Sequence, residues 1–238
     1  MKFLLLCAVM LFGSVPVTGE STQSTSLIAE SVNTSFSKVE LKVRKAAVRV
    51  WTGGGHGSGS YLVHKGFHFV LTAQHVANGP IGMTYIVGKG EEVAIATLVY
   101  SDAGDDIAVL YLPEKFNSIE PMKYKPTKKI SSVSERVTYS GFPSSHKLMT
   151  IRGRVAGYGD KEESGKQIIL HTYGWFGCSG SVIYNTSGEI VGVLWGVDAE
   201  YYPSVAVIED MIWVVPIQEL DIQIPINRIC KYNNLKFC

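Results

Sequence analysis

The chain has 238 residues, of which 46% are hydrophobic, and its 22 Lys and Arg against 21 Asp and Glu give a formal net charge of +1. This length and composition fit one mid-sized folded domain or two small ones, and they exclude a disordered or fibrous chain. Because no excess of positive charge is available to neutralise phosphates, we expect neither a nucleic acid nor an anionic membrane surface as a partner.

Residues 1–19 have the layout of a secretory signal peptide. Lys2 is the only charge there, an apolar run from Phe3 to Phe12 follows, and small residues precede an expected cleavage site after Gly19. The apolar run is too short to anchor the chain across a hydrocarbon core of about 30 Å. We therefore expect an exported protein, secreted or periplasmic, with no stable membrane anchor after signal removal. A buried N-terminal core helix is the alternative.

Cleavage there would remove Cys7 and leave an odd number of cysteines, namely Cys178, Cys230 and Cys238. Cys230 and Cys238 bracket a short polar stretch, and a disulfide closing this small loop is one expectation. Two free thiols in a reducing compartment are the alternative.

No metal or cofactor is predicted. His56, His64 and His68 lie in Gly-rich, strand-like segments, and no Cys-x-x-Cys or His-Glu-x-x-His spacing occurs near them.

Beyond the signal, residues 20–37 are polar and rich in Ser and Thr, which predicts a flexible lead-in. Residues 38–220 read as short apolar runs separated by turn signals, the pattern of an all-β sandwich or barrel. No long stretch has apolar residues at helical spacing, and only Ala73–Ala77 resembles a helical turn. A seam between two halves would fall at about 114–135, and residues 221–238 would form a C-terminal tail. The runs are 46–51, 59–63, 67–72, 83–87, 93–100, 107–112, 137–140, 148–156, 168–171, 182–184, 190–195 and 211–215.

Three segments carry groups that can do chemistry together. An apolar strand over residues 71–76 ends in His75, an acid precedes the hydrophobic strand 107–110, and Ser179 lies among glycines in the segment 177–181. A serine hydroxyl is a poor nucleophile until an imidazole takes its proton, and a carboxylate fixes the tautomer of that imidazole. The segments therefore supply a nucleophile, a base and a group that orients the base.

The order of these residues along the chain separates unrelated versions of this machinery. An α/β-hydrolase needs its His after the Ser, but the last His is His171. The subtilisin order needs Asp before His, and the first Asp is Asp102. What remains is the order His75, Asp106, Ser179, which is that of the chymotrypsin-type double barrel.

The segments Leu71-Thr72-Ala73-Gln74-His75-Val76, Asp106-Ile107-Ala108-Val109-Leu110 and Gly177-Cys178-Ser179-Gly180-Ser181 resemble the three signature blocks of chymotrypsin-fold serine proteases. The resemblance covers roughly 38–217 and is closest to compact HtrA-type and staphylococcal glutamyl-endopeptidase-like members. It implies two packed antiparallel six-stranded β-barrels, a trypsin-like domain over 38–220 and a catalytic cleft between the barrels.

Carried over by resemblance, Ser179 is the nucleophile, His75 the general base and acid, and Asp106 the orienting acid. The backbone N–H groups of Gly177 and Ser179 would form the oxyanion hole. Asp105 is the rival acid, but the family places its acid directly before the apolar strand, which favours Asp106. Cys178 is the rival nucleophile, although its flanks put Ser179 at the family's nucleophile position.

The resemblance also implies a polypeptide substrate. Residues 192–196 resemble the edge strand that pairs with an extended substrate backbone, so Leu194, Trp195 and Gly196 are expected to bind substrate, as is Tyr173 in the primary-pocket segment 171–176. Glutamyl-specific members have a His where this chain has Leu194, so specificity for Glu is not supported.

One departure from the family concerns activation. Zymogen-type members have an Asp just before the nucleophile, whereas this chain has Cys178, so activation through an ion pair at that position is not expected.

The sequence therefore predicts an exported serine endopeptidase that works through an acyl-enzyme. A catalytically silent binding or scaffold protein on the same fold is the alternative, and a self-processing viral protease is a narrower variant.

Overall fold

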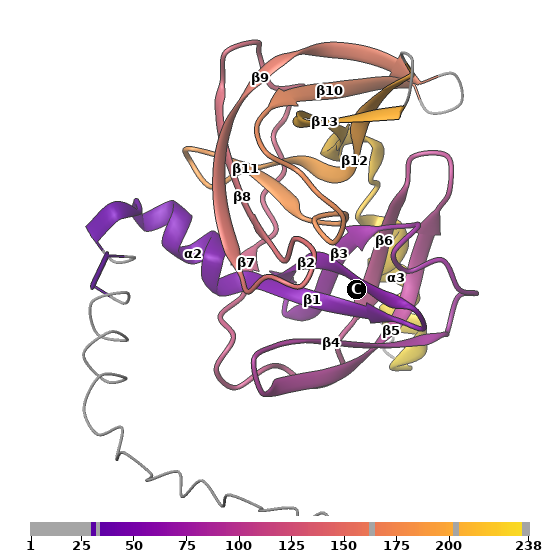
Figure 1. The fold of residues 1–238 in the computed structure, drawn as a ribbon. Helices are drawn as coiled ribbons and strands as arrows, with labels where there is room; N and C mark the ends of the chain where they lie inside the picture. Colours follow the sequence, from indigo (N-terminus) through magenta and orange to yellow (C-terminus); the bar gives the residue numbers. More distant parts are fainter. Residues whose placement is uncertain (1–29, 32–33, 162–164, 202–204, 235–238) are drawn as a thin grey trace, which may run out of the picture. The chain divides into compact units, whose positions relative to one another are not determined.

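The computed structural model describes residues 30–31, 34–161, 165–201 and 205–234. The expected signal peptide (1–19), most of the expected lead-in (20–37) and Cys238 lie outside these residues, so the Cys230–Cys238 disulfide stays a prediction. The chain divides into two units, Met1–Phe36 and Ser37–Cys238. The elements described below belong to the second unit (Figure 1).

The first half of this unit is a six-stranded antiparallel barrel. Its strands follow the order β1-β4-β5-β6-β3-β2 and close because β1 also pairs with β2, while β7 adds to β2 in parallel. The strands are β1 (Ala47–Thr52), β2 (Gly55–His64), β3 (Phe67–Ala73), β4 (Thr84–Lys89), β5 (Glu92–Asp102), β6 (Ile107–Tyr111) and β7 (Met122–Lys123).

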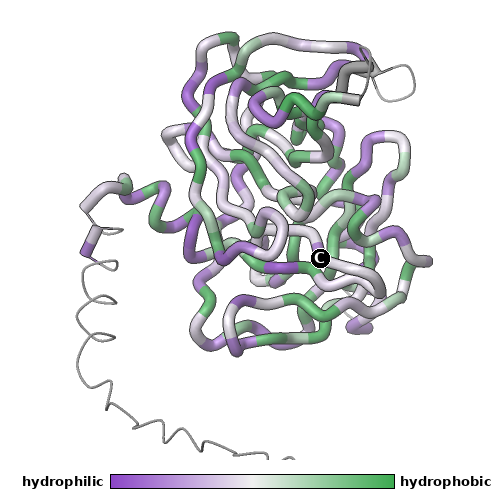
Figure 2. Tube along the Cα trace, in the orientation of Figure 1, coloured by the Kyte–Doolittle hydropathy of each residue, from purple (hydrophilic) through white to green (hydrophobic). Residues whose placement is uncertain are grey.

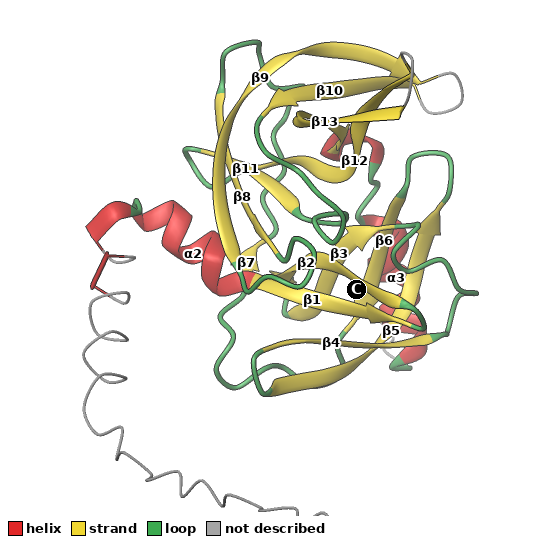
Figure 3. Ribbon diagram, viewed as in Figure 1, coloured by secondary structure: helices red, strands yellow, loops and turns green. Residues whose placement is uncertain are grey.

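The second half is another closed barrel of six antiparallel strands, in the order β10-β13-β12-β11-β8-β9. The connection between the barrels runs from residue 112 to residue 135. Figure 3 shows strands dominating both halves, and the predicted all-β fold with two six-stranded barrels is confirmed. The strands are β8 (Arg136–Gly141), β9 (Met149–Lys161), β10 (Gly165–His171), β11 (Val182–Asn185), β12 (Ile190–Tyr201) and β13 (Val205–Pro216).

The apolar runs of the sequence form the cores of the barrels (Figure 2). Strand β6 is buried at every position, as expected for a continuous apolar run. Tyr184, Val193 and Val215 of the second barrel belong to the same apolar cluster as the first-barrel core. The buried Ser60 and Tyr184 hydroxyls lie 2.7 Å apart and join β2 to β11. The barrels therefore share one interface of apolar contacts and at least one buried hydrogen bond.

The expectation of no helix beyond a turn is wrong for two segments. Helix α2 (Lys38–Ala46) begins at Ser37, whose side chain accepts from the Glu40 N–H while the Glu40 carboxylate accepts from the Ser37 N–H. This capping box satisfies donors that the first helical turn leaves without partners. Val43 and Ala46 then bury the inner face of the helix.

Helix α2 contacts both barrels. Val43 joins the first-barrel core, and the Arg152 guanidinium of β9 in the second barrel donates two hydrogen bonds to the Glu40 carboxylate. At the other end of α2, the Lys89 ammonium of β4 donates to the Arg44 and Lys45 carbonyls. A cation at the end of a helix stabilises carbonyls that have no partner within the helix.

The second helix, α3 (Gln223–Tyr232), lies in the stretch expected to be a tail and follows a short 3-10 turn, η1 (Ile217–Glu219). Ile226 and Ile229 are buried in the first-barrel core, and Arg228 donates to the Val99 carbonyl at 2.9 Å. In the ranges that the structure describes, no helix is long and apolar enough to span a membrane.

The Glu40–Arg152 pair predicts a pH dependence of stability. The Arg152 hydrogen bonds lower the pKa of Glu40 to about 2, below the ordinary value of 4.5. A carboxyl with a lowered pKa in the folded state stabilises the protein above its unfolded pKa, and this contribution disappears as the pH falls toward 2. We expect Glu40→Gln to lower the free energy of unfolding by roughly 1 kcal/mol at pH 7.

The difference between wild type and Glu40→Gln should shrink between pH 5 and pH 2.5, as measured by urea unfolding. The exposed Glu114 provides the matched control, because Glu114→Gln removes a charge that has no comparable partner. A Glu40→Gln effect of constant size across this range would contradict the prediction.

Candidate active site

His75 and Asp106 meet at one end of the first barrel. His75 lies two residues past the end of β3, and Asp106 directly precedes β6, the strand that pairs with β3. The Asp106 carboxylate accepts from the His75 backbone N–H at 2.8 Å through Oδ1 and from the ring Nδ1 at 2.7 Å through Oδ2. Since Nδ1 must carry the proton of this hydrogen bond, Nε2 of the neutral ring is left as a proton acceptor.

The backbone at Asp106 has an unusual conformation. Its φ is +52°, a left-handed conformation that Asp tolerates better than most residues. The Asp106 carbonyl also accepts from the Gln74 N–H at 3.1 Å, so the turn after β3 is bonded to this residue through both side chain and main chain. Asp105 belongs to the preceding turn, where its N–H donates to Asp102 Oδ1. The acid in contact with His75 is Asp106, as the sequence favours.

Ser179 lies in a tight turn between β10 and β11 of the second barrel. The turn needs two glycines with positive φ, Gly177 at +92° and Gly180 at +86°. A Cβ at Gly180 would overlap the Ser58 carbonyl and the Thr72 hydroxyl, and it would lie 3.0 Å from the Ala73 nitrogen. The serine turn therefore packs closely against β2 and the end of β3.

Gly57 links the two halves of the site. The Ser58 N–H donates to the Ser179 carbonyl at 2.7 Å. A Cβ on Gly57 would lie 2.9 Å from that carbonyl oxygen and 2.5 Å from a Val76 methyl carbon. The turn that carries His75 and the turn that carries Ser179 thus both pack on this glycine, and the structure brings together His75, Asp106 and the Ser179 turn.

The N–H groups of Gly177 and Ser179 are free to bind an anion. Within the described residues neither donates to a protein acceptor. The carbonyls around them are engaged elsewhere, because Phe176 accepts from the Ser144 N–H at 2.6 Å and Gly177 accepts from the Ser58 hydroxyl at 2.7 Å. Two free N–H groups beside a serine hydroxyl are what an oxyanion hole requires.

Cys178 is unsuited to act as the nucleophile. Its side chain is buried in the core of the second barrel, where its sulfur lies 3.8 Å from the Tyr139 hydroxyl oxygen. Burial raises the pKa of the Cys178 thiol, which keeps it protonated and unreactive. Cys178 therefore anchors the turn on its apolar side, while Ser179 is partly exposed.

Leu194 differs from its expected role in substrate binding. Its side chain is buried, its N–H donates to the Ser181 carbonyl and its carbonyl accepts from the Gly180 N–H. Leu194 therefore holds the serine turn through both its N–H and its carbonyl.

Trp195 and Gly196 lie where β12 no longer pairs with β11. The paired register of β12 with β11 ends at Val193, and from Gly196 on β12 pairs with β13 alone among the described strands. Trp195 lies at a bulge, where its indole N–H donates to Gln167 at 3.0 Å, and a Cβ on Gly196 would meet open space. An extended peptide can add to such an edge.

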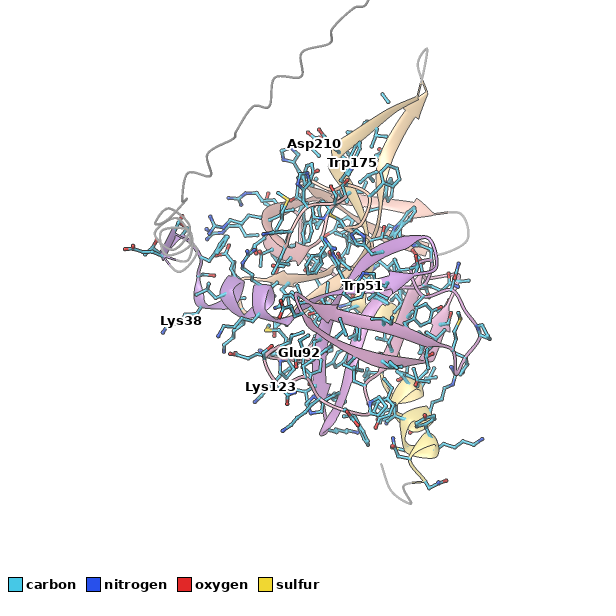
Figure 4. All side chains as sticks on the ribbon, turned by 60° about the horizontal axis from the view of Figure 1, so that its bottom comes forward. Lys38, Trp51, Glu92, Lys123, Trp175 and Asp210 are labelled. Carbon is cyan, nitrogen blue, oxygen red and sulfur yellow. The ribbon has the colours of Figure 1, made fainter. Side chains whose placement is uncertain are left out.

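Residues 171–174 run along β13, because the Thr172 N–H donates to the Asp210 carbonyl and the Gly174 N–H to the Glu209 carbonyl. The Tyr139 hydroxyl donates to the Tyr173 carbonyl. Gly174 is packed against the side chains of Ile212 and Val197, so its surroundings are apolar and leave no room for a side chain. Trp175 and Asp210, labelled in Figure 4, lie at the same end of the molecule, where the Asp210 carbonyl accepts from the Thr172 N–H.

Metal ligands do not gather in the part of the chain that the structure describes: no three His, Cys, Asp or Glu side chains form a group that could hold an ion there.

Several residues of the site were missed by sequence reasoning. The Ser58 hydroxyl donates to the Gly177 carbonyl of the serine turn, and the Thr72 hydroxyl donates to the Ser58 carbonyl. The loop from Phe142 to Leu148 contacts the turn at Phe176. The alternation of glycines at 53–59 was a usable signal, because closely spaced glycines in a strand mark positions where other backbone approaches.

Two closed barrels, with a His–Asp pair from one and a serine turn from the other, define the two-barrel architecture of chymotrypsin-like proteins. The trypsin-like peptidase domain matches residues 57–193, which is more than half of the chain. The chain therefore belongs to the trypsin-like peptidase family.

Solved structures give the same fold. The active form of the Rv3671c protease from M. tuberculosis is 17% identical with a TM-score of 0.60, and the match covers 90% of this chain and 91% of that one. An inactive form of the same protease is 18% identical with a TM-score of 0.59, over 76% and 88% of the two chains. The HtrA-type protease AlgW, solved as a variant with a decapeptide, is 15% identical with a TM-score of 0.61, over 76% and 63%. A search of curated proteins finds no match.

The packing of the serine turn predicts a strong penalty at Gly180. An Ala there would combine a positive φ with overlap of backbone atoms, so we expect Gly180→Ala to lower the free energy of unfolding by about 2 kcal/mol or more. Gly157 on β9 has open space around it and no positive φ, and Gly157→Ala should change stability by less than about 0.5 kcal/mol. Urea unfolding followed by tryptophan fluorescence measures both. Equal effects would contradict the packing described for Gly180.

Proposed function

We propose that this protein is an exported serine endopeptidase that cleaves polypeptides through an acyl-enzyme on Ser179. The observation that carries the proposal is the 2.7 Å hydrogen bond from His75 Nδ1 to Asp106, beside a serine turn with two free N–H groups. Membership of the trypsin-like peptidase family and the fold shared with known proteases support the peptidase class.

In the proposed first step, Ser179 Oγ attacks the carbonyl carbon of the peptide bond while His75 Nε2 takes the hydroxyl proton. The new negative charge on the substrate oxygen is bound by the N–H groups of Gly177 and Ser179. Asp106 stabilises the imidazolium that forms and keeps its Nε2 directed at the reacting atoms.

Collapse of this intermediate breaks the C–N bond, and His75 gives its proton to the leaving amine. An ester on Ser179 remains. Water then attacks the ester while His75 again takes a proton, and release of the acid restores the serine hydroxyl. The stretch of β12 from Trp195 onward, which no longer pairs with β11, would hold the substrate backbone in extended form.

We expect a fluorophosphonate probe to label the mature protein at Ser179. Ser179→Ala and His75→Ala should abolish labelling, and Asp106→Asn should lower kcat on a cleavable peptide by roughly 10⁴-fold, because the ring would then be held in the wrong tautomer. Gel fluorescence and steady-state kinetics measure the two effects.

Ser181→Ala is the matched control for the probe experiment, because the Ser181 hydroxyl is buried two residues further along the chain. This variant should label like wild type. A folded wild type that does not label would sink the peptidase proposal and favour the silent binding or scaffold protein. Labelling that survives Ser179→Ala would show that Ser179 is not the nucleophile.

Export is a separate part of the proposal, since residues 1–19 lie outside the described structure. We expect the protein made with its natural N-terminus in a secreting cell to begin at Glu20, as read by mass spectrometry of the intact chain. Gly19→Arg should block processing, because the cleavage site needs small residues. Recovery of the wild-type chain inside the cell with residues 1–19 attached would contradict export.

A further inference from the structure

The loop between β8 and β9, residues 142–148, touches the turn that forms the candidate oxyanion hole. The Ser144 N–H donates to the Phe176 carbonyl at 2.6 Å, and the Phe142 N–H donates at 3.0 Å to the same Ser58 hydroxyl that binds the Gly177 carbonyl. A Cβ on Gly177 would overlap the Phe142 carbonyl. The position of this loop therefore fixes the Phe176 and Gly177 carbonyls, which lie on either side of the Gly177 N–H in the chain.

The peptide bond between Phe176 and Gly177 needs contacts of this kind to keep its orientation. Because residue 177 is Gly, its backbone can populate both signs of φ at little cost, and the peptide plane can rotate. A rotated peptide would turn its carbonyl oxygen toward the place where the substrate oxygen must bind, and the Gly177 N–H would point away. The Ser144 hydrogen bond opposes this rotation, since it would be broken.

The loop in turn is held by the N-terminal part of the first barrel. The Arg49 guanidinium on β1 lies 5.0 Å from the centre of the Phe142 ring and donates to the His146 carbonyl at 2.7 Å. The His56 ring donates from Nε2 to the Phe142 carbonyl at 2.9 Å. Arg44 of α2 donates to the Leu148 carbonyl at 3.1 Å. Of these three side chains, Arg49 is the one that contacts both Phe142 and His146, on either side of Ser144.

We propose that Arg49 is a positioning residue for the oxyanion hole: by fixing Phe142 and His146 it keeps Ser144 bonded to the Phe176 carbonyl and leaves the Gly177 N–H free. This inference rests on the proposed function for its catalytic consequence. The effect of Arg49 on the Ser144 hydrogen bond does not depend on catalysis, so it can be tested without turnover.

The planar guanidinium is suited to this task. It stacks on the Phe142 ring with one face while an N–H at its edge reaches the His146 carbonyl. A Lys at this position can keep the hydrogen bond but not the stacking. Arg49→Lys should therefore fall between wild type and Arg49→Met, which loses both contacts and keeps most of the apolar stem.

Hydrogen exchange tests the hold on the loop. The Ser144 amide should exchange at least about 10-fold faster in Arg49→Met than in wild type, because its hydrogen bond opens more often. Lys45→Met is the matched control: it removes a cation near Arg49 in the chain whose side chain pairs with the exposed Glu120 instead. The control should exchange like wild type. An unchanged Ser144 amide in folded Arg49→Met overturns the inference.

Kinetics test the consequence. Loss of one oxyanion donor costs about 100- to 1000-fold in kcat, so a peptide that is rotated part of the time should cost roughly 10- to 100-fold in Arg49→Met. KM should change less than about threefold, and the inhibition constant of a peptide trifluoromethyl ketone should rise in parallel with the loss in kcat, since its adduct carries the oxyanion.

A merely structural role would lower the melting temperature and leave kcat and the inhibition constant of the folded enzyme unchanged, and that result would overturn the inference. A wild type without activity or labelling would instead overturn the proposed function, and the Ser144 exchange rates would still decide whether Arg49 holds the turn.

Discussion

The site depends on how one buried serine, Ser58, uses its polar groups. Its N–H donates to the Ser179 carbonyl, its hydroxyl donates to the Gly177 carbonyl, and its carbonyl accepts from Thr72. Ser58 is fully buried, so each of these groups would cost free energy without a partner. A single strand position thus joins β2, the end of β3 and the serine turn. The two barrels cannot separate here without leaving buried groups unpaired, and this fixes the distance between the turns that carry His75 and Ser179.

Much of this arrangement could be predicted from the sequence. Strands such as Ile107–Tyr111 are continuous apolar runs, and the order of His75, Asp106 and Ser179 selects one two-barrel architecture. The helices were missed for a physical reason. The apolar face of α2 consists of few residues, and only its contacts with distant strands make it stable. The clearest local signal for α2 was the capping box of Ser37 and Glu40.

The side-chain roles around the turn were harder to predict, because they depend on which residues from distant segments meet. Leu194 fits an edge strand by its sequence neighbours, yet its backbone is bonded to the serine turn. Arg49 reads as a polar residue in an apolar strand, and nothing local indicates a partner 97 residues further along the chain at His146. Cys178 was noted as a departure from the zymogen-type Asp. Its burial against Tyr139 shows that this turn is anchored by apolar packing where those relatives use a carboxylate.

Helix α2 has a consequence for the order of folding. Its partner on the second barrel, Arg152, lies 112 residues from Glu40, so the pair closes a very long loop. A nine-residue helix is marginal on its own in water, and α2 gains its stability only when both barrels present their surfaces. Docking of α2 is therefore a late event that follows the formation of β9. We therefore expect the segment from Ser37 onward to stay loosely attached until that strand has formed, so that the domain is completed by its part that is synthesised first.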